Sequence, residues 1–302
     1  MKKRVVIIIS TIAVLFGLDY LCDRILLHGV NEFYGLETHS DILLIGHSHL
    51  MLATDKERIE EELHLKVSKY TREGVNVHDR YTMVKQFLNS DYSDSLKFCL
   101  YGVDLCTFTG EGLSQNSYKL FYPFMDDSYV NQYIKSQTDS KDYLLHKIVR
   151  TSRYNDDGIK NASLRGWLHD WSNKKNGIID IELYRKKLAN GDERSIMMNP
   201  ELIDTFKSTM KMLTDKGIRV ILINTPTLDL LNEYEPDKYR NIVEWFETFA
   251  LENDLVEYWD FNPQYSSRHD IFHDRLHLNA RGQEIITTEI VNRLKRDSLC
   301  YQ

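Results

Sequence analysis

The feature that most constrains the fold is an uncharged apolar run that ends in a glycine and a polar cluster. Residues 41–50 read Asp-Ile-Leu-Leu-Ile-Gly-His-Ser-His-Leu, and no charge interrupts Ile42 to Ile45. A short run of this kind is typical of a strand buried on both faces, as in a parallel sheet. Gly46 permits a sharp turn at the carboxyl end of that strand, where open α/β sheets bind their ligands. The sequence therefore predicts that Ser48 lies in a crevice at this edge of the sheet.

Further apolar segments alternate with helical patterns and predict the rest of the sheet. After a first strand at 41–45, we expect strands at 66–70, 96–103, 218–224 and 255–259, a turn at 74–79, and helices at 55–63, 80–88, 200–216, 237–253 and 280–295. Strands that alternate with helices imply an α/β fold with a parallel sheet covered on both faces. The alternation stops between about 105 and 200, so we interpret that stretch as an insertion. Its many aromatic residues either pack a small core of their own or form a platform for sugar rings.

The N-terminus carries the one targeting signal. Lys2, Lys3 and Arg4 precede 14 apolar or small residues, Val5 to Leu18, as in a secretory signal. Residues 20–22 extend this stretch toward the length of a membrane span, with Asp19 the one charge inside it. No Ala-x-Ala-like cleavage site follows, which favours an uncleaved anchor over a cleaved signal peptide. A buried helix of a cytosolic protein is the other alternative.

The sequence therefore predicts a membrane-anchored protein in three parts. We expect a signal anchor or transmembrane helix at 1–28, a linker at 29–40, and a domain at 41–302 that contains the insertion at about 105–200. The excess of positive charge before the apolar stretch predicts that the N-terminus is cytoplasmic and that the domain is periplasmic or extracellular.

Composition and motifs limit the classes of ligand that we expect. The formal net charge of −7 argues against a nucleic-acid partner, which usually leaves a basic footprint. The absence of a Cys-x-x-Cys motif gives no support for a zinc or redox site, and we expect no cofactor. His47 and His49 could chelate a metal together with His277 or His273, but no carboxylate or cysteine stands beside them in the sequence. We therefore expect no metal.

Two blocks far apart in the chain carry the chemistry. A serine is a poor nucleophile without an adjacent base, and the segment 272–282 offers His277 with Asp274 three residues before it. The blocks Ile45-Gly-His-Ser-His49 and Asp274-x-x-His277-Leu-Asn-x-x-Gly282 together resemble the SGNH/GDSL hydrolase superfamily. They are most similar to its membrane-anchored bacterial members, whose serine block reads Gly-x-Ser-[Arg/His]. The resemblance covers residues 41 to about 104 and about 218 to 297.

This resemblance implies a fold and a catalytic triad. The fold is a flavodoxin-like three-layer sandwich with a five-stranded parallel sheet in the order 2-1-3-4-5. In the triad, Ser48 is the nucleophile, His277 the base and Asp274 the residue that orients the base.

The resemblance also implies an oxyanion hole, and here the sequence departs from the family pattern. Family members stabilise the oxyanion with the serine N–H, a glycine N–H and an asparagine side chain. Gly74 is the candidate glycine, although Val77 stands where the pattern has a second one. Asp104 stands in place of the asparagine, and a charged carboxylate cannot donate a hydrogen bond. Asn76 is the alternative donor, and His49 takes the position of a family arginine or histidine that supports the pocket.

The function implied is that of a serine acyl esterase or O-acyltransferase acting on acetyl esters of a cell-surface glycan. Water as the acceptor gives an esterase and a sugar hydroxyl gives a transferase, and the sequence does not separate the two. The expected partners are an acylated carbohydrate or other small ester, the membrane through residues 5–22, and envelope polysaccharide machinery. The alternative is a non-catalytic SGNH-fold binding or assembly protein of envelope polysaccharide export, which Asp104 and Val77 favour.

Overall fold

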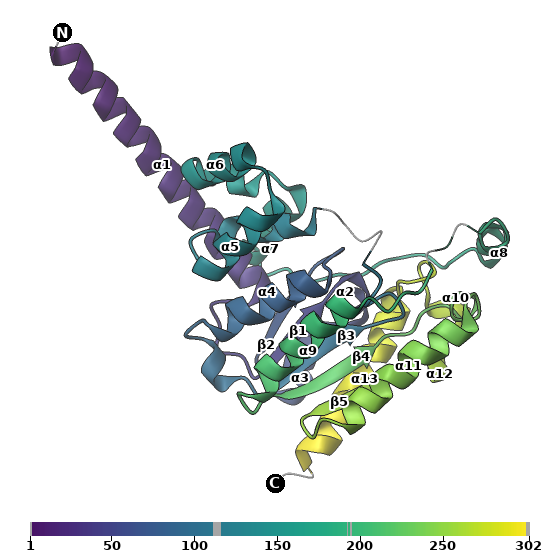
Figure 1. Ribbon diagram of the computed structural model, residues 1–302. Coiled ribbons are helices and arrows are strands. Elements are labelled where there is room, and N and C mark those ends of the chain that lie inside the picture. The colour runs from purple at the N-terminus through teal and green to yellow at the C-terminus, as the bar shows by residue number, and fades with distance from the viewer. Residues whose placement is uncertain (1, 111–115, 192, 194, 300–302) are drawn as a thin grey trace. The chain divides into compact units, whose positions relative to one another are not determined.

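A five-stranded, all-parallel sheet forms the centre of the fold (Figure 1). The computed structural model describes residues 2–110, 116–191, 193 and 195–299. The strands are β1 (Ile42–Gly46), β2 (Val67–Thr71), β3 (Phe98–Val103), β4 (Arg219–Asn224) and β5 (Val256–Asp260). Their order is β2-β1-β3-β4-β5, which confirms the predicted α/β class and strand order.

The register of the sheet brings the carboxyl ends of β1, β3 and β4 to one edge. Ile42 of β1 is level with Val67 of β2 and with Phe98 of β3, and all five residues of β1 are buried. Because the strands are parallel, the residues that follow β1, β3 and β4 all emerge at the carboxyl edge of the sheet. His47, Asp104 and Thr225 are these residues.

Helices cover both faces of the sheet. On one face, Ile42 and Leu44 share a hydrophobic core with residues of three helices, α2 (Ser48–Ala53), α3 (Lys56–Leu63) and α13 (Ala280–Leu299). On the other face, Tyr101 of β3 lies edge-on to Phe206 of α9 (Pro200–Thr214) with ring centroids 5.6 Å apart. Successive residues of a strand point to opposite faces, which is why an unbroken apolar run serves two cores.

The remaining elements in the same part of the chain as the sheet are helices. They are α4 (Val77–Leu88), α8 (Ile181–Ala189), α10 (Asp229–Asn232), α11 (Pro236–Leu251), α12 (Asn262–Tyr265) and the short 3-10 helices η1 (Ser93–Ser95) and η4 (His269–Ile271). Two of the predicted elements need correction. The segment after β1 forms the helix α2, which begins at Ser48. Helix α4 begins at Val77, inside the predicted turn, because Asn76 and Asp79 form a reciprocal capping box there.

The chain divides into two compact units. One contains residues 38–117 and 171–302 and includes the whole sheet; the other contains residues 1–37 and 118–170. The second unit is helical in its described residues: α1 (Lys2–Tyr34), η2 (Ser117–Phe124), α5 (Ser128–Gln137), α6 (Ser140–Ile148), η3 (Arg150–Tyr154) and α7 (Asp157–Trp167). The stretch predicted as a linker, 29–40, thus begins inside a helix that runs on to Tyr34.

Helix α1 is long and apolar enough to cross a membrane. Its residues from Val5 to Leu18 are exposed, whereas its second half packs against α7. Gly29 and Gly166 make this packing close: a Cβ atom on Gly166 would lie 1.8 Å from the carbonyl oxygen of Gly29. The N-terminal helix is therefore both a candidate membrane anchor and part of a folded unit.

Several aromatic residues of the predicted insertion are buried. Phe108 lies among Phe206, Trp245 and Phe246, with ring centroids 4.8–5.5 Å from it. Phe121 and Tyr122 are buried in the helical unit. Phe121 and Tyr122 fit the expectation of a small core within the insertion, whereas Phe108 packs on α9 and α11 outside it.

Candidate active site

Ser48 stands at the first position of α2, directly after β1. His47 caps this helix: its Nδ1 accepts the backbone N–H of His49 at 3.1 Å, and its carbonyl oxygen accepts the N–H of Met51. The first N–H groups of a helix have no partner within the helix, and the N–H of Ser48 is one of them. The serine is thus presented with its own backbone N–H unused by the helix.

Gly46 is needed for close packing and not for the sharp turn that the sequence predicts. It does not have a positive φ. A Cβ atom there would lie 3.0 Å from Cβ of Leu50, and one on Gly102 of β3 would lie 2.9 Å from the same atom. Two neighbouring strands therefore carry glycines so that α2 can rest on the sheet. This approach fixes the position of Ser48.

His277 and Asp274 lie on a tight turn that is stabilised by hydrogen bonds between its own residues. The backbone N–H of His273 donates to the carbonyl oxygen of His277 at 2.8 Å. Oδ1 of Asp274 accepts the N–H groups of Leu276 and His277, both at 2.9 Å. Asp274 thus caps the turn and, with the same carboxylate, reaches the His277 ring.

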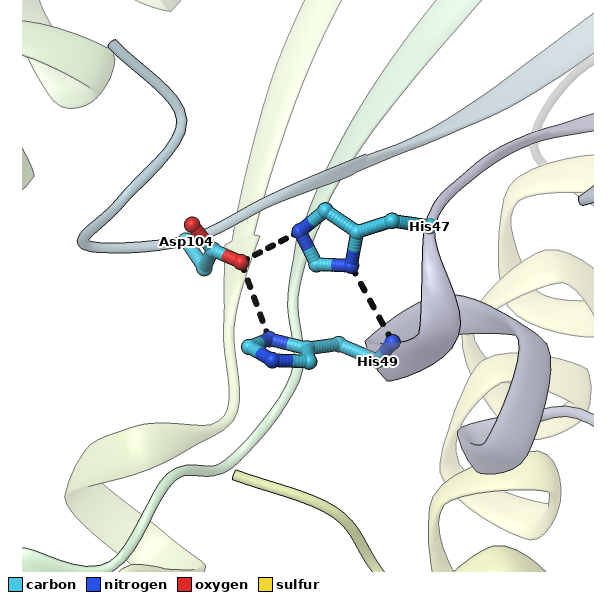
Figure 2. Close-up of side chains that lie close together, drawn as sticks. All are labelled: His47, His49 and Asp104. Carbon is cyan, nitrogen blue, oxygen red and sulfur yellow. Dashed lines mark hydrogen bonds and ion pairs between the residues drawn. The ribbon is translucent and has the colours of Figure 1, made fainter. Parts of the chain in front are cut away.

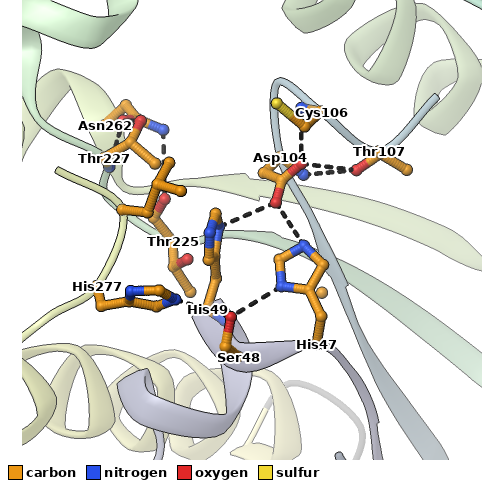
Figure 3. A network of polar contacts seen from close by, with 12 residues as sticks. His47, Ser48, His49, Asp104, Cys106, Thr107, Thr225, Thr227, Asn262 and His277 are labelled. Atoms are coloured by element: carbon orange, nitrogen blue, oxygen red, sulfur yellow. Dashed lines mark hydrogen bonds and ion pairs between the residues drawn. The ribbon is translucent and has the colours of Figure 1, made fainter. Parts of the chain in front are cut away.

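Ser48, His277 and Asp274 form a continuous hydrogen-bonded chain, of which Figure 3 shows Ser48 and His277. Nδ1 of His277 lies 2.8 Å from Oδ2 and 3.0 Å from Oδ1 of Asp274, and its Nε2 lies 2.8 Å from Oγ of Ser48. A carboxylate only accepts, so Nδ1 carries the proton and Nε2 is left to accept the hydroxyl proton of Ser48. Burial acts to raise the pKa of Asp274, but hydrogen bonds from His277 and the backbone hold that pKa far below its usual range. The carboxylate therefore stays ionised and keeps the ring in this tautomer.

Asp104 does not point a free carboxylate at the serine, because its Oδ2 contacts two histidines (Figure 2). Its Oδ2 lies 2.5 Å from Nε2 of His47 and 2.9 Å from Nδ1 of His49, and its Oδ1 accepts the N–H of Cys106. All three side chains are buried. Burial opposes ionisation of Asp104, yet the two imidazoles hold its pKa well below the usual value. The residue that replaces the expected asparagine thus belongs to a cluster behind Ser48.

The same three side chains have the composition of a metal site, since their ligand atoms lie within 4.8 Å of one another. The sequence shows no carboxylate beside the two histidines; the fold supplies Asp104. The backbone N–H of His49, however, occupies the lone pair of Nδ1 of His47, so the ring proton sits on Nε2 and faces Asp104. Nε2 can bind a metal only if it loses that proton and the ring becomes an anion. The tautomer of His47 therefore disfavours a metal ion at its Nε2, although Oδ2 of Asp104 and Nδ1 of His49, which lie close together, have no hydrogen-bond partner of good geometry among the described residues.

The other predicted pocket residues have clear backbone roles. Gly74 has a φ of +77°, which favours glycine at that position. Oδ1 of Asn76 accepts the N–H of Asp79 at 2.9 Å, which makes Asn76 the cap of α4. Among the described residues, no contact joins either one to Ser48. The structure brings His49 to the site, with its ring centroid 5.3 Å from that of His277.

Sequence reasoning missed two residues of this site. His47 was considered only as a metal ligand, whereas it caps α2 and binds Asp104. Thr225 follows β4, is buried, and its Oγ1 has no hydrogen-bond partner among the described residues. Figure 3 draws it with His49 and His277. Its position after a strand of the same sheet was the one signal available.

No protein-family model and no curated protein matches this chain. Among solved structures, it is similar to one described as "a putative platelet activating factor from Streptococcus pneumonia". The identity is 11%, the alignment covers 94% of this chain and 99% of the other, and the TM-score is 0.38. Roles for Ser48, His277 and Asp274 therefore rest on the geometry given above.

Proposed function

We propose that this protein is a serine-dependent acyl-transfer enzyme, with Ser48 as nucleophile. The observation that carries the proposal is the chain of contacts from Asp274 through His277 to Ser48, with hydrogen-bond distances of 2.8 Å at both ends of the imidazole. A serine becomes a nucleophile when a base accepts its proton and a third group orients that base. The sheet edge where these residues meet is where α/β folds of this kind bind their ligands.

Each residue then has a definite role in the reaction. Oγ of Ser48 attacks the carbonyl carbon of an ester while Nε2 of His277 takes the hydroxyl proton. The tetrahedral intermediate collapses as His277 gives that proton to the leaving alcohol, and an acyl-Ser48 remains. A second hydroxyl, from water or from a sugar, then attacks the acyl group with His277 again as base. Asp274 stabilises the imidazolium at both stages.

The backbone N–H of Ser48 is the best-supported oxyanion donor. It sits at the start of α2, where N–H groups lack helical partners. An ionised Asp104 facing the oxyanion would oppose this stabilisation, but its Oδ2 is directed at His47 and His49. This arrangement supports an active site over the binding role that Asp104 suggested in the sequence.

The substrate and the location are further parts of the proposal. The resemblance of the serine and histidine blocks to membrane-anchored SGNH hydrolases supports an acetyl ester of a cell-surface glycan. Helix α1 supports attachment to the membrane, with the enzyme outside the cytoplasm. Water as the acceptor would make the protein an esterase, and a glycan hydroxyl would make it an O-acetyltransferase.

Trapping of the acyl-enzyme tests the proposal. The full-length protein in detergent is mixed with p-nitrophenyl acetate, quenched in acid, and its peptides are analysed by mass spectrometry. We expect an added acetyl group on Ser48 that is absent in Ser48→Ala and strongly reduced in His277→Ala. The matched control is Ser195→Ala, which removes an exposed serine outside the triad. A folded wild-type protein that never acetylates Ser48 would favour the non-catalytic binding role.

A further inference from the structure

Helix α6 carries an apolar surface that faces solvent. Its residues Leu144, Leu145 and Ile148, with Val149 after it, are 53%, 47%, 56% and 39% exposed. Positions 144, 145 and 148 share one face of the helix by their spacing. The opposite face is packed: His146 is buried, bonds Ser152 and stacks on Tyr122. We define the four apolar residues as the α6 surface.

This surface lies at the end of its unit that is nearest the exposed part of α1. The backbone N–H groups of Arg150 and Thr151, which follow Val149, both donate to the Asp19 carboxylate. Contacts then move along α1 in step with the chain: Tyr154 binds Asp23, and Ser163 binds the carbonyl oxygen of Leu26. The residues directly after the α6 surface are therefore level with Asp19, and the chain that follows them extends away from the apolar residues that precede Asp19.

The exposed apolar segment of α1 is short, and this places the adjoining end of the helical unit close to the bilayer. Residues Val5 to Leu18 are 14 in number, and at about 1.5 Å per residue they span about 21 Å. The hydrocarbon core of a bilayer is about 30 Å thick. Asp19 does not extend this membrane-spanning segment, because its carboxylate is bound by Arg150 and Thr151. A span this short draws its flanking residues into the interface or thins the bilayer around it.

The groups around Asp19 are those that favour a lipid–water boundary. Tyr20 is exposed, and the guanidinium of Arg150 lies over its ring, 5.3 Å from the centroid. Tyrosine is enriched at membrane interfaces, and arginine reaches the headgroups from there. Lys141 and Lys147, both exposed, are on α6 and can meet anionic headgroups.

We propose that the α6 surface is inserted into the lipid interface beside α1 and that it forms a second contact of this protein with the membrane. The short apolar segment of α1 crosses the membrane. The α6 surface adds apolar contact with lipid at the outer end of this segment, where the segment is shorter than the hydrocarbon core is thick. This arrangement fixes the helical unit against the bilayer, where a tether would leave it free to rotate. It depends on α1 crossing the membrane and is independent of the chemistry at Ser48.

Photo-crosslinking in a bilayer tests this proposal. The full-length chain receives p-benzoylphenylalanine at Leu145 or, separately, at Ile148, and is reconstituted into nanodiscs of phosphatidylethanolamine and phosphatidylglycerol. The control position is Leu168, which is 66% exposed in the same unit but follows Trp167, whose indole N–H binds the carbonyl of Ile25 away from the apolar end. All three proteins must melt at the temperature of the wild type.

After illumination, phospholipid adducts are counted by mass spectrometry. We expect several-fold more lipid adduct at 145 and at 148 than at 168. Adducts at 145 and 148 that are no more frequent than at 168 would overturn the proposal. Crosslinks from 145 and 148 to polypeptide alone would also overturn it, and would show that a protein covers the α6 surface.

Discussion

At the residue scale, one short turn contributes to two groups of polar contacts, one half-buried and one buried. Ser48 faces His277, while His47 and His49 on either side of it hold Asp104. The contact of Ser48 with His277 and Asp274 was expected from the sequence because the two blocks that carry these residues resemble one family pattern and because Ser48 follows a buried strand. The Asp104 cluster was not predictable, because its carboxylate comes from another strand and only the parallel register of β1 and β3 brings it to the histidines.

The tautomer of His277 gives a prediction for Asp274. Asp274→Asn keeps the size of the side chain but removes the carboxylate that holds the proton on Nδ1. We expect kcat for p-nitrophenyl acetate to fall by about 10³- to 10⁴-fold with little change in KM. Asp270→Asn is the matched control, since Asp270 pairs with Arg268 and Arg281 and not with His277. Comparable rates in the two variants would remove Asp274 from the mechanism.

The buried His47 gives a prediction about stability and pH. Burial lowers its pKa to about 3, against the opposing effect of Asp104, while an unfolded histidine has a pKa of about 6.5. The unfolded chain therefore binds one more proton between these values. We expect this group to lower the free energy of unfolding by about 1.4 kcal/mol per pH unit as the pH falls from about 6.5 toward 3.

Urea unfolding followed by tryptophan fluorescence at several pH values measures this slope. His47→Asn, whose Oδ1 can still accept the N–H of His49, should flatten it. His64→Asn is the control: His64 is exposed and has a φ of 54°, which asparagine tolerates. An unchanged slope in His47→Asn would show that His47 is charged in the folded protein.

At the element scale, the strands were the most predictable part of the fold. Apolar runs such as Ile42–Ile45 and Val220–Ile223 have no charge and are too short for core helices, so their type follows from the sequence. Their order in the sheet was implied only by the family resemblance. Helix α2 was missed because it has only six residues and starts with polar ones. The start of α4 was misplaced because a capping box at Asn76 resembles a turn until both of its bonds are seen.

The contact between α2 and the sheet gives the element-scale prediction. Gly102→Ala would place a Cβ atom 2.9 Å from Cβ of Leu50 on α2. Overpacking of this kind typically costs about 1–3 kcal/mol of stability, and here it should also move Ser48 and slow its acylation. Gly17→Ala is the control, because nothing lies within 4 Å of a Cβ atom there. Equal melting temperatures and acylation rates for the two variants would contradict this role of Gly102.

At the scale of the whole molecule, helix α1 combines an exposed apolar half, which is a candidate membrane span, with a half that belongs to a folded unit. The sequence predicted an anchor that ends at residue 28 and a linker after it, because hydropathy detects the apolar half of α1 only. The second half is specified by long-range partners: Asp19 binds Arg150, Asp23 binds Tyr154, and Gly29 fits against Ser163. Such pairs have no signature within a sequence window.

The packing of α1 on α7 gives a prediction with a control in the same helix. Gly29→Leu would place a Cβ atom 2.2 Å from the backbone oxygen of Ser163, whereas Gly17 has open space around it. We therefore expect Gly29→Leu to open residues 118–170 to protease and Gly17→Leu to leave them protected, as mapped by limited proteolysis and mass spectrometry. Equal protection in both variants would mean that α7 does not need its close contact with α1.

The central claim is that the fold activates Ser48, and labelling with a serine-directed fluorophosphonate tests it most directly. The probe is added to the folded full-length protein in detergent, beside Ser48→Ala, His277→Ala and Ser195→Ala, and the modified peptide is identified by mass spectrometry. We predict rapid labelling of Ser48 in the wild type and in Ser195→Ala, none in Ser48→Ala, and at most slow labelling in His277→Ala. A wild-type protein that is not labelled at Ser48, or whose labelling is as fast in His277→Ala, would contradict the claim.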